Sequence, residues 1–123
     1  MTAIKFSFDI QVAGGPQMKF NDKLEVDAYD SIEVSLNGGE TKTISVQPAN
    51  ADKVKLLFIR SSVPSDKVSF ENKDAQDQVT LVNPLLLMGD AVALLVNAPK
   101  DLKFKNGLAD PVTIQILAGR TAV

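Results

Sequence analysis

Apolar and polar residues alternate along most of this chain, and this period of two constrains its fold more than any other feature. From residue 4 to residue 12 every second residue is apolar, with lysine, serine, aspartate and glutamine between them. Side chains of a strand point alternately to its two faces, so this pattern predicts a strand with one face against a core. Similar segments recur between turn-forming residues about every 8–12 positions, which gives about nine or ten short strands.

Many short strands separated by turns are typical of a β-sandwich or a barrel. We therefore expect one domain over residues 1–123, an all-β, antiparallel, jelly-roll-like sandwich. Residues 4–12 are expected to form an early core strand, and the six phenylalanines fall mostly on inward positions. Asn37-Gly38 predicts a hairpin between residues 32–36 and 44–46, because Asn-Gly adopts the positive φ that tight hairpins need.

One stretch breaks the alternation, because residues 85–96 are apolar everywhere except at Gly89-Asp90. Residues 56–59 are also apolar without interruption. A strand that is apolar on both faces needs cover on both, either from its own domain or from another chain. If another copy provides this cover, the expected oligomer interface contains Leu85, Leu86, Leu87, Met88, Val92, Leu94, Leu95, Leu57 and Ile59.

The same stretch also has a helical alternative. Pro84 would suit the first position of a helix, and the leucines and alanines that follow it favour helices. Gly89-Asp90 in the middle argues instead for two short strands, which we expect. Periodicity alone does not separate a buried strand from a buried helix.

The chain contains no histidine, cysteine or tryptophan. Ser-His-Asp and Cys-His catalysis and the usual zinc, iron and copper sites all need histidine or cysteine. We therefore expect no enzymatic activity, no cofactor and no metal. Carboxylates at positions 27, 30, 33, 66, 71, 74 and 77 leave acid–base chemistry formally open, although such residues in turns are usually solvated. Residues 72–77 concentrate oxygen donors that could bind Ca²⁺, but Lys73 and the missing alternation of carboxylates favour an ordinary loop.

Charge and hydropathy bear on partners and location. The net charge of −2 argues against nucleic acid as a partner, because phosphate binding normally needs a basic surface. No segment offers the ~20 apolar residues of a membrane-spanning helix, and the N-terminal segment lacks the apolar run of a signal peptide. We expect a cytoplasmic protein, with incorporation into an extracellular particle left open.

These observations favour a non-enzymatic structural module that forms a homo-oligomer. Small jelly rolls of this kind serve as building blocks of virus and phage particles, an analogy of fold alone. The alternative is a module that binds a carbohydrate or another small molecule. Tyr29, in a polar setting, would then be the aromatic platform of a concave site.

Overall fold

The computed structural model describes residues 2–45, 54–72, 78–94 and 101–121. This part of the chain contains ten β-strands and one 3₁₀ helix. In chain order they are β1 (Thr2–Gln11), β2 (Gln17–Val26), β3 (Ala28–Leu36), β4 (Thr41–Ser45), β5 (Val54–Ser61), β6 (Ser65–Asn72), β7 (Gln78–Leu81), β8 (Leu85–Met88), η2 (Gly89–Leu94), β9 (Asp101–Asn106) and β10 (Val112–Arg120).

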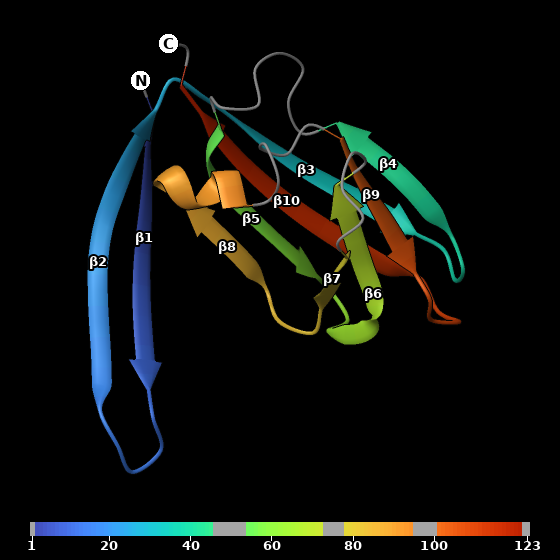
Figure 1. Cartoon of the computed structure of the whole chain (residues 1–123), viewed down its shortest axis with the longest axis horizontal. Coiled ribbons are helices and arrows are strands. Elements are labelled where there is room, and N and C mark those ends of the chain that lie inside the picture. Colours follow the sequence, from blue (N-terminus) through green and yellow to red (C-terminus); the bar gives the residue numbers. More distant parts are fainter. Residues whose placement is uncertain (1, 46–53, 73–77, 95–100, 122–123) are drawn as a thin grey trace.

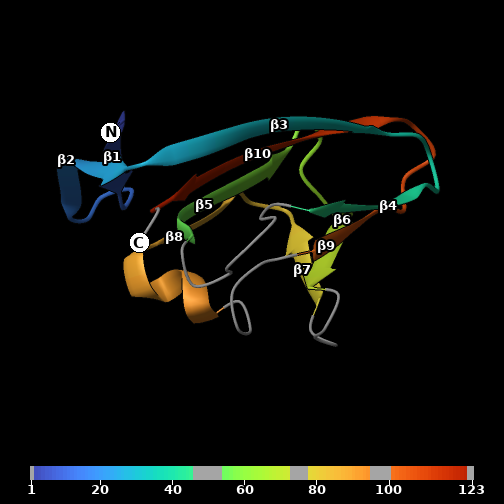
Figure 2. The same cartoon turned by 90° about the horizontal axis from the view of Figure 1, so that it is seen from above.

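Eight of these strands form two four-stranded antiparallel sheets that lie as separate layers (Figures 1 and 2). The first sheet has the order β3-β10-β5-β8 and the second the order β4-β9-β6-β7. The pairs are nested, since β3 pairs with β10, β4 with β9, β5 with β8 and β6 with β7. A long hairpin rolled into two layers gives this arrangement, which is the jelly roll. The predicted antiparallel, jelly-roll-like sandwich is confirmed.

The core lies between the two sheets. Ile59 and Leu57 on β5 lie opposite Ile116 and Ala118 on β10, and all four are buried in one cluster. The second sheet contributes aromatic rings to the same cluster. Two of them, Phe70 and Phe104, have ring centroids 5.4 Å apart. Burial of one such side chain contributes about 1.5–3 kcal/mol, so these inward rows supply most of the stabilisation of the body.

The segment after Pro84 is one strand followed by a 3₁₀ helix. The first of the two expected short strands is therefore confirmed, and the second is wrong. β8 pairs with β5, and η2 begins directly after it at Gly89. Gly89 has a φ of 62°, which ends the extended backbone and which glycine adopts without a steric penalty. Val92 on η2 is buried against the core. The helix therefore buries part of this apolar stretch in the core of its own chain.

The predicted hairpin at residues 37–40 is also corrected, because β3 and β4 belong to different sheets. The turn is real, since the Glu40 N–H donates to the Asn37 carbonyl at 3.0 Å, but it links the two layers. The buried side chain of Asn106 fastens it, because its Nδ2 donates to the carbonyls of Leu36, Asn37 and Asp110 at 2.8–3.2 Å. Alternation predicts a strand but not its partner, which explains the error.

Replacing a core ring tests this assignment of the core. Phe104→Ala is expected to lower the free energy of unfolding by about 3–5 kcal/mol, because it leaves a cavity between the sheets. Phe20→Ala removes the same ring from an exposed position and is expected to cost about 1 kcal/mol or less. Urea unfolding followed by circular dichroism measures both. Equal losses in the two variants would contradict the assignment.

Candidate interaction surface

β1 and β2 form a hairpin that belongs to neither sheet of the body. Their register places Ile10 opposite Met18 and Phe8 opposite Phe20. A turn closes the tip, where the Val12 N–H donates to the Pro16 carbonyl at 2.9 Å. Figure 1 shows the hairpin leaving the body where β2 continues into β3 and running beside the body to a free tip. We call residues 2–26 the arm.

The two faces of the arm differ in polarity. One face is polar, with Gln17 Nε2 donating to Asp9 Oδ1 at 2.9 Å. The other face carries three phenylalanine rings in contact, at centroid distances of 5.8, 5.9 and 6.5 Å. The alternation and the register assign to this apolar face Ile4, Phe6, Phe8, Ile10, Val12, Met18, Phe20, Asp22 and Leu24. The sequence pattern is therefore reproduced, with the apolar row on one face.

The apolar face is nevertheless uncovered, so the expectation that residues 4–12 form a core strand is wrong. Ile10, Met18 and Phe20 are 59%, 64% and 51% exposed. Phe6 and Phe8 are only half-buried, and neither belongs to the core between the sheets. The alternation indicates that one face of a strand is apolar, but it does not indicate what covers that face. Contiguous apolar surface of this kind marks contact sites on folded proteins.

The base of the arm is packed on the outer face of the first sheet. The Asp27 N–H donates to the Arg120 carbonyl at 3.0 Å, which holds the junction of β2 and β3. A Cβ added at Gly119 on β10 would lie 2.9 Å from Ile4 Cδ1 and 3.2 Å from Val26 Cγ1. Glycine thus leaves the space that the two side chains of the arm fill. Leu56, buried on the neighbouring strand, lies outside the main core and next to this contact.

Beyond the base of the arm, the outer face of the first sheet has a second apolar area, which is only partly covered. The registers of β10, β5 and β8 align Leu117, Phe58 and Leu86, which we call the outer row. These residues alternate with inward neighbours such as Ile59 and Leu57 and are half-buried. β5 and β8 are therefore apolar on both faces, as their sequences indicate.

The residues of the expected interface divide into three groups. Leu57, Ile59 and Val92 are buried in the core of their own domain, so they are removed from the interface set; Leu85 and Leu87 also pack against that core. Leu86 and Met88 alternate with them and lie on the outer face, half-buried. The side chain of Leu94 and all of Leu95 lie outside the described residues. The apolar residues of the arm were not expected to lie in an interface, although their alternation was plain in the sequence.

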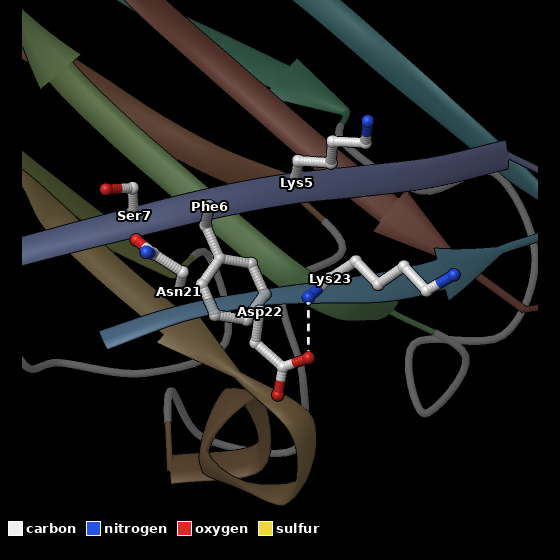
Figure 3. Close-up of a pocket in the computed structure, with 6 residues that line it drawn as sticks. All are labelled: Lys5, Phe6, Ser7, Asn21, Asp22 and Lys23. Carbon is white, nitrogen blue, oxygen red and sulfur yellow. Dashed lines mark hydrogen bonds between the residues drawn. The ribbon is translucent and has the colours of Figure 1, made fainter.

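Asp22 interrupts the apolar face of the arm. It lies opposite Phe6, and its Oδ1 accepts the N–H of Lys23 at 2.7 Å (Figure 3). Its side chain is about as long as that of Leu24 but places a carboxylate beside the Phe6 ring. An open depression of about 420 Å³ is lined by Phe6 and Asp22 and also by Lys5, Ser7, Asn21 and Lys23, which belong to the polar face of the arm.

Two smaller depressions lie on the body. One of about 270 Å³ is polar and lies beside Lys103 and Glu71, whose Nζ and Oε1 are 3.8 Å apart. The other, of about 220 Å³, lies between the end of β5 and Pro84. Tyr29 is exposed on β3 but lines none of the three depressions. Its role as a ligand platform stays a prediction.

The carboxylates singled out in the sequence are dispersed. Asp30 pairs with Arg120, and Glu71 pairs with Lys103. Asp74, Asp77 and most of the expected calcium loop lie outside the described residues. Within residues 2–45, 54–72, 78–94 and 101–121, no group of three acidic residues is placed to hold a metal ion. No helix in those same ranges is long and apolar enough to cross a membrane.

The contact at Gly119 predicts how the arm is anchored. In Gly119→Val the new side chain competes with Ile4 and Val26 for the same space. We expect a loss of about 1–3 kcal/mol in the free energy of unfolding and faster amide hydrogen exchange in β1 and β2. Thr113→Val, on the same face of β10 but away from the arm, is the control. Unchanged exchange in the arm of Gly119→Val would contradict the anchoring.

No protein-family model matches this sequence, and no curated protein sequence matches it. Among solved structures, the chain is similar to the solution NMR structure of a de novo designed double-stranded β-helix, with a TM-score of 0.46 and 17% identity. The match covers 72% of this chain and 97% of the designed one.

Proposed function

We propose that this chain is a non-enzymatic structural module that assembles with copies of itself through the arm. The observation that carries the proposal is the apolar face of the arm, which is exposed along its outer half. A two-stranded hairpin is at best marginally stable alone in water. Contact with another molecule would cover the exposed rings and stabilise the hairpin at the same time.

A comparison of the free energy of burial with the cost of association supports a contact that involves more than one arm. Covering Ile10, Val12, Met18 and Phe20, each roughly half-exposed, contributes about 4 kcal/mol per arm. Association costs about 4–15 kcal/mol in lost freedom. One arm alone therefore offsets little more than the lower end of this cost. In an assembly where each copy contributes an arm and a second apolar surface, the free energy gained by burial exceeds the cost of association.

The rest of the chain fits a structural role. It lacks histidine and cysteine, on which most nucleophilic and metal-dependent catalysis relies. Jelly rolls are used as capsid domains, which supports a particle-type building block by analogy of fold. The proposal therefore rests on surface contact rather than on chemistry.

Light scattering coupled to gel filtration, over a dilution series, tests the proposal. We expect the wild-type mass to be at least two times 13.2 kDa and a whole multiple of it. Phe20→Asp places a charge on the apolar face and is expected to give a folded monomer, because an unpaired charge resists burial. Asn21→Asp adds the same charge to the polar face of the same strand and is expected to leave the mass unchanged.

Two outcomes would contradict self-assembly. One is a wild-type monomer at the highest concentration reached. The other is a Phe20→Asp variant that keeps the wild-type mass. Circular dichroism on both variants establishes that any change in mass does not come from unfolding.

A further inference from the structure

We propose that the arm of one copy docks on the outer row of a second copy, with Asp22 meeting Arg60, and that the exchange is reciprocal. This inference rests on the proposed self-assembly and names the surface that receives the arm. Four features of the molecule support it: the apolar surfaces, the charges, the ring of Phe6 beside the Asp22 carboxylate, and the area available.

The outer face of the first sheet already receives part of an arm. At Gly119 it accommodates Ile4 and Val26 from the base of its own arm. The adjacent outer row of Leu117, Phe58 and Leu86 continues this apolar surface but is only half-buried. The middle and tip of its own arm run beside the body instead (Figure 1). The row is therefore open to side chains of the same kind from a second copy.

The charges distinguish this docking from a face-to-face packing of two arms. Asp22 is the one charged residue on the apolar face of the arm, and none of the described residues forms an ion pair with it. Two arms packed face to face would place Asp22 against a surface without a cation, which is unfavourable. On the sheet, Arg60 follows Phe58 by two residues and lies on the same face. The sheet therefore offers Asp22 a partner that a second arm does not.

The exposure and the hydrogen bonding of Arg60 fit its role as the partner of Asp22. Its side chain is exposed, and its Nε donates to Gln115 Oε1 at 2.5 Å, which holds the guanidinium over the sheet. Among the described residues it forms no ion pair. The terminal nitrogens of a guanidinium bind a carboxylate in a two-pronged geometry. Arg60 is thus positioned beside the outer row and carries a charge of the required sign.

Phe6 and Asp22 together suit an arginine. They lie opposite each other on the same face of the arm, so an aromatic ring and a carboxylate are neighbours there (Figure 3). An arginine stem packs on apolar surface, and its guanidinium is attracted by both a ring face and a carboxylate. Arg60 of the second copy would lie against this pair, which would leave Phe8 and Phe20 over the outer row.

The area favours reciprocal exchange over a single contact. Each strand of the arm has ten residues, so the arm is about 33 Å long and about 10 Å wide. Because the base already packs on its own sheet, the part left for a second copy is about 20 Å long, a face of roughly 200 Å². One arm on one sheet would bury roughly 400 Å² in total, the size of a typical lattice contact. Two arms exchanged about a twofold axis would bury roughly 800 Å², the size of a weak, reversible interface.

A charge swap tests the pairing in the full chain. Asp22→Arg and Arg60→Asp are each expected to raise the dimer dissociation constant at least about tenfold, whereas the double variant restores it to within about threefold. Asn21→Arg, on the polar face beside Asp22, is the control and leaves the constant within about threefold. Sedimentation or light scattering over a dilution series measures the constants.

The outcomes separate this inference from the proposed function. If Phe20→Asp dissociates the oligomer but the double swap does not restore association, self-assembly stands and the docking site is overturned. If the wild type does not associate at all, both proposals fail. Restoration by the double swap supports both.

Cysteine cross-linking identifies the chain that provides the arm, because the protein has no native cysteine. Asp22→Cys and a size-tagged Arg60→Cys variant are mixed and joined by a short bifunctional thiol reagent. A direct disulfide would require Cα atoms about 4.4–6.8 Å apart, closer than an arginine and an aspartate that meet through their side chains. We expect the mixed dimer, and Asn21→Cys with Arg60→Cys is the control that does not form it. A chain carrying both Asp22→Cys and Arg60→Cys that instead closes on itself at high dilution would show that the arm folds over its own sheet, and would overturn the inference.

Discussion

The central position of β10 is the constraint on which the rest of the structure depends. This strand forms backbone hydrogen bonds with both β3 and β5, and its side chains alternate between two environments. Ile114 and Ile116 face the core between the sheets, whereas Leu117 and Gly119 face outward. The inward residues hold the sandwich together. The outward residues provide the place where the arm is anchored and the apolar surface beside it.

The body and the arm illustrate two uses of the same sequence pattern. In the body, alternating apolar rows from two sheets bury each other, and Phe70 and Phe104 meet across neighbouring strands. In the arm, the ring contacts of Phe8 and Phe20 are with each other and with Phe6. A two-stranded ribbon has no second layer, so its apolar face stays in water until another surface covers it. Our proposal assigns that surface to a second copy of the chain.

Polar residues fix details that the apolar pattern leaves open. Asn106 is buried where two loops meet, and its Oδ1 accepts the N–H of Leu108 at 2.9 Å while its amide donates to the facing loop. A buried amide with satisfied hydrogen bonds holds a connection in one geometry, because leaving it unpaired is costly. In the sequence, Asn106-Gly107 is a pair typical of turns. Its partners, about 70 residues away in the chain, became visible only in the folded structure.

The sequence by itself determined that this chain is an all-β protein with strands near their observed positions and with β5 and β8 apolar on both faces. These properties are local, since the period of two and the turn residues act over a few neighbours. Only the tertiary structure decided which strands pair, that residues 37–40 cross between sheets, and that residues 4–12 leave the body. Pairing and burial depend on residues distant in the chain, and an apolar face looks the same in the sequence whether a core covers it or water does.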